Sequence, residues 1–385
     1  MNDTYVEKKG FGTRMKNSFS GIIGGIIFVI IGIGLLIFNE RNNVKNIHDV
    51  KEIKDAYVEV KSDTLSKDND GKLIVTNGKL DFGDETLTDE KFGISIKTPK
   101  LERKVEIYQW KEEVENSDSE TTYRYTKEWS TELEDSSKFK EKSGHTNPGS
   151  MPYEKTTAEA KELKIGVYKL SSAFNSKISA NKTYNGLEDA TVPEGYKVYN
   201  SYITNSEEPD SPQVGDVRIS FNYADYTDVT VMGKLNWDTI VEYTTKEKTN
   251  ITYFVDGTHD GAYIISSIEK GNKFMKWILR LIGTILIIGG IASLFGPLTT
   301  LSSYVPILGN LVSGATGIIS IFVGLAISLV VIAFSWIIFR PLLGIALLAI
   351  AILLVFLAKK FATKKAGAVP VQQNPVQQNP YNPQQ

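Results

Sequence analysis

The sequence contains no cysteine and only three histidines in 385 residues. The lack of cysteine excludes disulfide bonds, thiolate nucleophiles and cysteine-ligated metal sites. His48, His145 and His259 lie far apart in the chain, so no pair has the short spacing of a metal-binding motif. The chain also lacks a Gly-x-Ser-x-Gly elbow, a phosphate-binding glycine-rich loop and a His-Glu-x-x-His motif. We therefore expect no catalytic residue, no cofactor and no bound metal.

An excess of either charge is missing as well. The chain has 43 lysines and arginines against 45 aspartates and glutamates, a formal net charge of -2. Nucleic-acid binding requires a concentrated basic surface, so we expect no nucleic-acid partner. Asp81, Asp84 and Glu85 form a local acidic cluster, which favours a solvated face, with a calcium site as the alternative.

Charge is absent from one run near the N-terminus, residues 21–38. At 1.5 Å per residue a helix of this length reaches about 27 Å, close to the roughly 30 Å of a bilayer core. A signal peptide is the alternative, but Asn39, Glu40 and Arg41 follow where a small-residue cleavage site belongs. We predict an uncleaved first transmembrane span over 21–38, preceded by a cytoplasmic segment over 1–20.

Charge is also scarce in the C-terminal third, residues 276–358. Proline interrupts helices, so Pro297 and Pro341 divide this region. We predict spans over about 277–296, 316–339 and 341–358, with a re-entrant or interfacial segment over about 302–314. The alternative for residues 304–339 is two short segments. The tail over 359–385 is rich in Gln, Asn and Pro and is expected to be disordered and cytoplasmic.

Basic residues flank the first and last spans and set the expected orientation. The positive-inside rule places both chain ends in the cytoplasm, which requires an even number of spans. Four spans satisfy it and place the intervening domain outside the cytoplasm. Lys273, Lys276 and Arg280 lie beside the second span and argue against this orientation. The basic residues at the two ends are Lys8, Lys9, Arg14, Lys16, Lys359, Lys360, Lys364 and Lys365.

The polar middle, residues 39–275, has the alternating pattern of β-strands. Helices are predicted only at Thr156–Leu163 and at 261–271, with Gly271 as a break. The fold class is therefore a membrane protein with four transmembrane α-helices, one N-terminal and three C-terminal, and an inserted β-rich α+β extracytoplasmic domain. An all-β sandwich is the alternative for the domain. Strands are predicted at 57–60, 73–76, 92–96, 104–110, 214–222, 229–232 and 249–255.

Aromatic residues are concentrated on two of these segments, separated by an acidic turn at 116–120. A hairpin would bring Tyr108, Trp110, Tyr123, Tyr125 and Trp129 together. Packing within the domain and a binding face are both compatible with this pattern.

Several segments of the chain carry distinctive motifs in a fixed order. Val105–Trp110 (VEIYQW) precedes Tyr123–Tyr125 and Trp129, and Gly144–Pro148 (GHTNP) precedes 214–224 (VGDVRISFNYA). Asn39-Glu40 closes the first span and Arg340-Pro341 divides the last two. From about residue 21 to 358, the chain resembles the transmembrane protein 43 family, also called LUMA. We expect the family-motif positions to have a structural or an interaction role. They are Asn39, Glu40, Tyr108, Gln109, Trp110, Trp129, Gly144, His145, Asn147, Pro148, Gly215, Asp216, Arg218, Arg340 and Pro341.

The resemblance implies a four-span protein with cytoplasmic or nucleoplasmic ends and a large lumenal domain. The animal member is associated with the endoplasmic reticulum and inner nuclear membrane, where it looks like an organiser partnered with emerin and lamins. The family offers no catalytic residue to carry over. The Gln/Asn/Pro tail and the lack of cysteine depart from it. Frequent Lys, Asn and Ile are typical of an AT-rich genome and favour a bacterial cell membrane, where emerin and lamin-type partners do not apply.

The combined expectation is a non-enzymatic, multi-pass scaffold that organises membranes. Its expected partners are membrane lipids, other membrane proteins or copies of itself. A transport or channel component is one alternative, although the predicted spans contain few polar residues. A membrane-tethered hydrolase using two carboxylates is the other, because paired carboxylates cannot be recognised before the fold is known.

Overall fold

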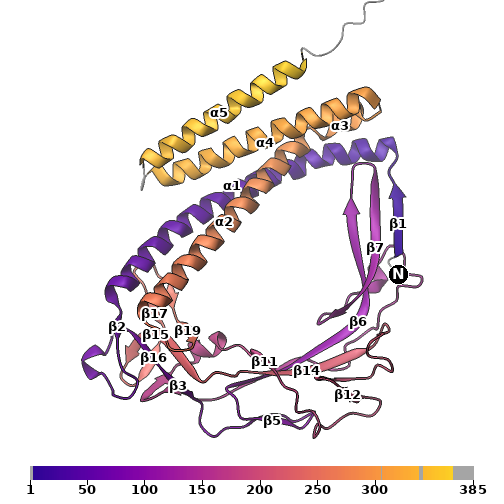
Figure 1. Cartoon of the computed structure of the whole chain (residues 1–385). Coiled ribbons are helices and arrows are strands. Elements are labelled where there is room, and N and C mark those ends of the chain that lie inside the picture. The colour runs from indigo at the N-terminus through magenta and orange to yellow at the C-terminus, as the bar shows by residue number, and fades with distance from the viewer. Residues whose placement is uncertain (1–2, 305, 338–340, 367–385) are drawn as a thin grey trace, which may run out of the picture. The chain divides into compact units, whose positions relative to one another are not determined.

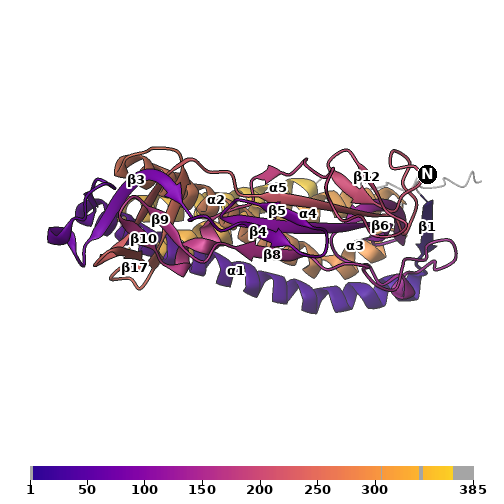
Figure 2. The ribbon, with the colours of Figure 1, turned by 90° about the horizontal axis from the view of Figure 1, so that it is seen from below.

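The chain forms two compact units, one rich in β-strands and one built from helices. The computed structural model describes residues 3–304, 306–337 and 341–366. The β-rich unit contains residues 1–9 and 43–274, and the helical unit contains residues 10–42 and those from 275 onward. The β-rich domain is confirmed, and Figures 1 and 2 show it in two orientations.

The first sheet of the β-rich unit has eight strands and is built around a long hairpin. This hairpin joins β6 to β7 through an acidic turn, as the sequence predicts, and it is visible in Figure 1. All pairings in this sheet are antiparallel. Its strands are β1 (Asp3–Lys8), β6 (Lys100–Asn116), β7 (Glu120–Ser130), β8 (Thr156–Glu159), β11 (Lys182–Thr183), β12 (Lys197–Tyr199), β13 (Tyr202–Thr204) and β14 (Val217–Tyr223).

The second sheet has seven strands and is centred on β3 and β15. Two of its pairings, β2 with β3 and β10 with β16, are parallel. Its strands are β2 (Val58–Glu59), β3 (Leu73–Asp81), β9 (Leu163–Ile165), β10 (Tyr168–Leu170), β15 (Asp228–Asn236), β16 (Thr239–Val241) and β19 (Tyr253–Asp256). The remaining elements are the pairs β4 (Leu87–Asp89) with β5 (Ile94–Ile96) and β17 (Tyr243–Thr244) with β18 (Asn250–Ile251), and the 3-10 turns η1 (Lys67–Asn69), η2 (Ser136–Lys138) and η3 (Ser172–Lys177).

The first sheet buries one main cluster of apolar side chains, whereas the second sheet has an apolar cluster on each face. The inward face of the first sheet packs Ile107, Ile219 and Phe221 against Phe92 of the β4–β5 connection. These residues alternate with outward-facing ones along β6 and β14, which is the period of a strand with one wet face. All seven predicted strand regions contain strands of the structure, although their ends differ by several residues.

The N-terminal segment differs from the prediction. Residues 3–8 form β1, which pairs with β7 from Asp3↔Tyr125 to Lys8↔Glu120. The predicted separate segment over 1–20 is therefore divided between a strand of the β-rich unit and the start of a helix. Thr4, Tyr5 and Val6 favour strand formation, but their partner strand lies more than a hundred residues away.

Two helix predictions within the domain need correction. Thr156–Leu163 is not helical: Thr156–Glu159 is β8, paired with β6 at Arg103↔Thr156. The pairing with β6 overrides the good helix propensity of this stretch. Gly271 does not break the second segment, because α2 continues through it from Gly261 to Leu294.

The described helices are longer than the predicted spans. They are α1 (Phe11–Ala56), α2 (Gly261–Leu294), α3 (Gly296–Ser302), α4 (Pro306–Ile337) and α5 (Pro341–Ala366). α1 continues past Phe38 because residues 39–56 contain neither glycine nor proline. Within the described residues, α1, α2 and Val312–Ile337 are long and apolar enough to cross a membrane, and Gly344–Leu357 is a shorter apolar helix.

The structure also differs from the predicted re-entrant segment at 302–314 and from the start of the predicted tail at 359–385. Most of the proposed re-entrant segment is the first part of α4, which begins at Pro306. Residues 359–366 continue α5, and the rest of the predicted disordered tail lies outside the described residues. Figure 1 shows α4 and α5 side by side within the helical unit.

Glycines bring α1 and α2 into close contact within the helical unit. A Cβ at Gly32 would lie 2.8 Å from the carbonyl oxygen of Gly283, and one at Gly25 would lie 2.6 Å from that of Gly290. Such approaches leave no room for a side chain. Gly21, one helical turn before Gly25, has nothing within 4 Å of its added Cβ.

We expect Gly32→Ala to destabilise the α1–α2 contact, because its methyl group would meet the backbone oxygen of Gly283 as well as the Ile287 side chain. Overpacking of this kind costs about 1–3 kcal/mol. Thermal unfolding of the full chain in detergent should therefore begin several degrees lower. Gly34→Ala is the matched control, since an added Cβ there has open space around it. Equal melting temperatures for the two variants would contradict this packing.

Candidate functional site

The motif residues of the domain gather on and beside the β6–β7 hairpin. The register pairs Tyr108 with Trp129 and Trp110 with Lys127. Because directly paired residues share a face of a sheet, all five clustered aromatics lie on one face, as the sequence analysis suggested for a hairpin. Tyr123 and Tyr125, the other two, pair with Val114 and Glu112.

Asn147 closes the open edge of β6. The ladder between β6 and β14 ends at Ile107↔Val217, which leaves the following backbone groups of β6 without a strand. The Asn147 side chain takes the place of that strand: its Oδ1 accepts from Trp110 N at 2.7 Å and its Nδ2 donates to Trp110 O at 2.8 Å. Nδ2 also donates to Glu134 O at 3.2 Å. One amide thus satisfies both backbone groups of a buried edge.

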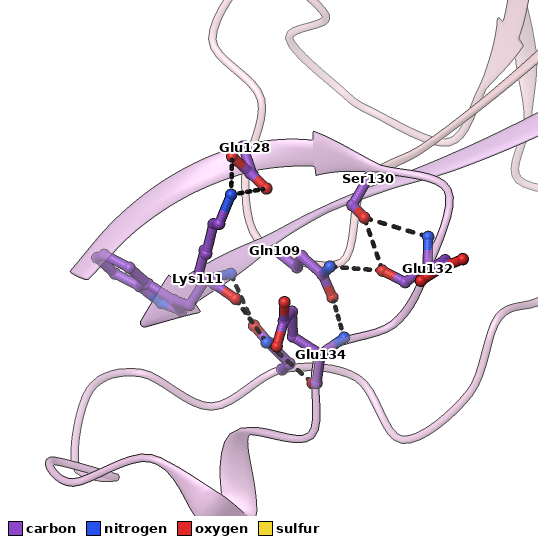
Figure 3. A network of polar contacts seen from close by, with 8 residues as sticks. Gln109, Lys111, Glu128, Ser130, Glu132 and Glu134 are labelled. Carbon is purple, nitrogen blue, oxygen red and sulfur yellow. Dashed lines mark hydrogen bonds and ion pairs between the residues drawn. The ribbon is translucent and has the colours of Figure 1, made fainter. Parts of the chain in front are cut away.

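Gln109 makes the same kind of bond from the neighbouring position. Its Nε2 donates to Glu132 O at 2.7 Å, and its Oε1 accepts from Glu134 N at 2.9 Å. Figure 3 shows this pair of bonds beside the Lys111–Glu128 ion pair. Gln109 is fully buried, so both ends of its amide require these partners. Together, Gln109 and Asn147 fasten the segment that follows β7 onto the hairpin.

Gly215 and Asp216 bond to the same edge of β6, between the end of β14 and Asn147. Tyr108 N donates to Asp216 O, and Gly215 N donates to Tyr108 O. Gly215 has φ +101°, a conformation that favours glycine. The Asp216 carboxylate accepts from Ser206 Oγ at 2.5 Å and from Gln213 N at 2.8 Å, which closes the turn before β14. An added Cβ at Gly215 would touch the ring of Pro148, so two motif segments meet here.

His145 packs between aromatic rings. It stacks on Tyr125 with ring centroids 3.9 Å apart and meets Trp110 edge-on at 4.7 Å. Its Nδ1 lies 2.9 Å from Glu141 O and its Nε2 lies 3.5 Å from a carboxylate oxygen of Asp3 in β1. The neighbouring Gly144 has φ +82°, so the turn that delivers the histidine requires glycine.

Tyr125 beneath this histidine is fully buried. Burial, with the hydrogen bond to Glu112, raises the pKa of Tyr125 to about 12. Its hydroxyl stays protonated at neutral pH and donates to Glu112 Oε2 at 2.6 Å. The same hydroxyl accepts from Glu141 N at 2.8 Å, which ties the loop to the sheet again.

Trp129, Tyr108 and Arg218 form a stack on the outer face of the sheet. The Trp129 ring lies 5.3 Å from that of Tyr108, and the Arg218 guanidinium lies 4.5 Å above it. Arg218 also holds Glu106 through two bonds of 2.7 and 3.0 Å. Burial acts to raise the pKa of Glu106, but hydrogen bonds from Arg218 and Lys104 outweigh it and lower that pKa.

The stack continues across the sheet to β13 and β12. Arg218 pairs with Thr204, so Tyr202, two residues earlier, shares its face. Tyr199 pairs with Tyr202, and their rings are 5.8 Å apart. All members are half-buried. We call this surface, formed by Tyr108, Trp129, Tyr199, Tyr202 and Arg218, the aromatic face.

The acidic cluster considered for calcium is dispersed. Asp84 pairs with Lys97 at 2.6 Å and Glu85 with Lys161 at 3.2 Å, while Asp81 Oδ1 accepts from Gly83 N. Hydrogen bonds from these lysines lower the pKa of both Asp84 and Glu85. The described residues contain no group of three or more His, Asp or Glu side chains arranged to hold a metal.

Asn39 and Glu40 form a second motif site, inside the helical unit. Glu40 is 1% exposed and accepts two bonds from Arg280, from Nε at 2.6 Å and Nη2 at 2.8 Å. Trp336 Nε1 also donates to Glu40. Asn39 donates to the backbone oxygen of Lys276 at 3.2 Å. The site therefore joins α1, α2 and α4 through one carboxylate.

The last motif pair is only partly described. Arg340 lies outside the described residues, and Pro341 is the first residue of α5. Proline is common at a helix start, because its missing N–H has no helical partner there.

Comparison with known proteins agrees with this arrangement. The family model described as Transmembrane protein 43 matches residues 107–341, which covers more than half of the chain. The chain belongs to the transmembrane protein 43 family. Transmembrane protein 43 of Mus musculus is 28% identical over 354 residues, covering 86% of this chain and 88% of the mouse protein. The Homo sapiens protein is 27% identical over the same shares, and the Drosophila melanogaster homolog is 27% identical over 83% of this chain and 89% of its own length. No solved structure matches significantly.

Two residues of these sites were not expected from the sequence. Trp336 is a single tryptophan in a long apolar run and shows no pattern that points to Glu40. Tyr202 lies in a three-residue strand, too short to show alternation. Arg280 was recognised only as a basic residue beside the second span, and the structure pairs it with the motif residue Glu40.

We expect Asn147→Asp to loosen residues 132–148, because a carboxylate cannot donate to Trp110 O or Glu134 O. Leaving a buried backbone oxygen unpaired costs about 1–3 kcal/mol, which corresponds to roughly 5- to 150-fold faster local opening. Hydrogen–deuterium exchange of the full chain measures this local opening directly. Asn236→Asp, at an exposed position of β15, is the control and should leave exchange unchanged. Unaltered exchange over 132–148 in Asn147→Asp would contradict the edge-closing role.

Proposed function

We propose that this family member is a non-enzymatic membrane-organising protein whose domain docks other membrane proteins through the aromatic face. Protein interfaces concentrate their binding energy in tyrosine, tryptophan and arginine. The aromatic face contains only these residue types, drawn from five strands of one sheet. This observation carries the proposal.

The arrangement of Arg218 supports a docking role. Glu106 and Trp129 hold its guanidinium from two sides, so it loses little freedom when a partner binds. Side chains fixed in this way reduce the entropic cost of association.

The motif polar groups support the same proposal. Gln109 and Asp216 bind backbone groups of neighbouring loops, and Asn147 binds a backbone group of β6. They give the sheet a rigid border, which is what a docking surface requires. We favour a bacterial cell membrane, with lipids, other membrane proteins or a second copy as partners. Endoplasmic reticulum or inner nuclear membrane, with emerin or lamin-type partners, applies only to a eukaryotic source.

The strand β1 bears on how the domain lies relative to the membrane. Residues before the apolar run 21–38 pair with β7, and residues after it, from 43, belong to the same unit. We infer that the chain enters and leaves this apolar segment on one side of the bilayer. The N-terminal strand and the domain then share a side, in place of the expected opposite sides.

The distribution of basic residues fits this topology. Lys8 and Lys9 then lie on the same side as Lys273, which the earlier orientation left on the wrong side. We therefore propose that the domain faces the cytoplasm.

A photo-crosslinking amino acid at Tyr199 tests the docking surface. We expect it to capture a defined membrane protein, or a second copy of the chain, in intact membranes. Val198 is the matched control: it is the adjacent residue of β12, points to the opposite side of the sheet and is 40% exposed. Equal capture at both positions, or no protein adduct at Tyr199, would refute the proposal.

A pair of introduced cysteines tests the topology. The chain has no cysteine of its own, so no other disulfide can form. Val6 pairs with Thr122. Lys9 N donates to Ser119 O, so Lys9 and Ser119 form a hydrogen-bonded pair. Hydrogen-bonded and non-hydrogen-bonded pairs alternate along an antiparallel ladder, so Val6 and Thr122 form a non-hydrogen-bonded pair, in which the side chains lie closest. We expect Val6→Cys with Thr122→Cys to form a disulfide on mild oxidation in intact membranes, and Val6→Cys with Thr126→Cys to form none.

Glycosylation provides an independent check on the side of the membrane. Asn181 and Asn250 lie in sequons, so a lumenal domain would be modified at either when the chain is made in eukaryotic microsomes. We expect no modification. Glycosylation, or the lack of the Val6–Thr122 crosslink, would overturn the shared-side topology.

A further inference from the structure

Both ends of α1 are held by the same folded unit. Before the helix, Lys9 N donates to Ser119 O at 2.8 Å, which fixes the chain to the β6–β7 hairpin. Only Gly10 lies between this fixed residue and the start of α1. Near the end of the helix, Ile53 is 1% exposed and belongs to a buried apolar cluster that includes residues of β3. The apolar run 21–38 therefore lies between two anchors in one domain.

α1 has no point at which the chain could turn back. It is one continuous helix from Phe11 to Ala56 and contains no proline. Lys9 and Ile53 are separated by about 65 Å along such a helix. If α1 crossed a bilayer, these two residues would lie on opposite sides of it. A single folded domain cannot hold both of them there.

α2 follows the same path in the opposite direction. A Cβ added at Gly25 would meet Gly290, and one added at Gly32 would meet Gly283, so residue numbers fall along α2 as they rise along α1. The two helices are thus antiparallel over much of the apolar run. Like α1, α2 also contains residues of the β-rich unit, from Gly261 to residue 274. Whatever direction α1 takes relative to the bilayer, α2 shares it.

We propose that α1 and α2 lie along the plane of the membrane within one leaflet, the leaflet that faces the β-rich domain. The acyl chains of that leaflet cover the exposed apolar side chains. This inference rests on the shared-side topology proposed above and goes beyond it. A segment that enters and leaves on one side could also dip to the middle of the bilayer and return, but that path requires a turn that α1 lacks.

The exposed face of α1 fits hydrocarbon along the length of the run. Ile23, Ile30 and Ile37 are seven residues apart, share one face of the helix and are 65%, 64% and 51% exposed. Arg14 precedes the run and Arg41 follows it. Under the positive-inside rule, basic residues at both ends suit a segment whose two ends lie on the cytoplasmic side.

The arrangement gives the proposed membrane-organising role a physical basis. Helices inserted into one leaflet take up area in that leaflet alone, and the binding of such helices is sensitive to membrane curvature. The protein is then coupled to the shape of the membrane through α1 and α2, independently of any partner at the aromatic face.

Depth-dependent quenching of a fluorescent label tests the arrangement. Ile23→Cys, Ile30→Cys and Ile37→Cys each carry the label in the full chain, in phosphatidylcholine–phosphatidylglycerol vesicles with a nitroxide at a shallow or a deep position of the acyl chain. A helix in the membrane plane keeps all three labels at one depth, so the ratio of shallow to deep quenching should agree within about twofold. A crossing helix places the outer two labels about 10 Å nearer to the headgroups than the label at residue 30.

Trp237→Cys is the control, because Trp237 is 79% exposed in the turn between β15 and β16 and its label should be quenched by neither lipid. A ratio that falls at residue 30 and recovers at residue 37 would overturn the proposal. The crosslink between residues 6 and 122 separates the two possible failures. If it forms and the ratio still falls at residue 30, the in-plane arrangement alone is wrong; if it does not form and the ratio falls, the shared-side topology is wrong as well.

Discussion

The helical unit depends on the ion pair between Glu40 and Arg280. The Glu40 side chain has no exposed surface, and such a carboxylate is tolerated only when a cation and further donors replace water. Arg280 supplies the cation through two bonds, and Trp336 supplies a third donor from another helix. Removing one partner from a buried pair typically costs about 3–5 kcal/mol, because the other charge is left alone. Three helices therefore share one electrostatic requirement.

In the β-rich unit the comparable constraint is the edge of β6. This strand continues beyond the end of β14, so its outer backbone groups need substitutes for a neighbouring strand. Gly215, Asp216 and Asn147 provide them in succession. Three of the family-motif positions are thus explained by hydrogen bonding to one strand. The aromatic face lies on the surface that this border keeps in place.

Local patterns in the sequence were sufficient for much of this structure. Alternation predicted β3, β6, β14 and β15, and an acidic turn between aromatic segments predicted the β6–β7 hairpin. Apolar length predicted the membrane helices but not their ends, because α1 continues through polar residues that are compatible with a helix. Distant pairing was not predictable: Thr156–Glu159 is a strand only because β6 lies beside it. β1 was missed for the same reason.

The candidate sites were predictable only in part. The family resemblance supplied the positions of Asn147, His145 and Glu40, but not what each one contacts. Asn147 reaches β6 from an irregular segment, for which sequence gives no register. Tyr202 and Trp336 carry no motif of their own, and they join their sites only through strand pairing and helix packing.

The pairing of β1 with β7 has a consequence for biosynthesis. β1 leaves the ribosome well before its partner strand, which is complete only when residue 130 has been made. During that interval the apolar run of α1 is already available to the membrane, while residues 3–8 have no strand to join. The outer edge of β7 then stays exposed until β1 folds back onto it, and an exposed edge readily pairs with other chains. Long-range closure of this kind is slow. The step that covers the edge of β7 therefore depends on a strand synthesised more than a hundred residues earlier.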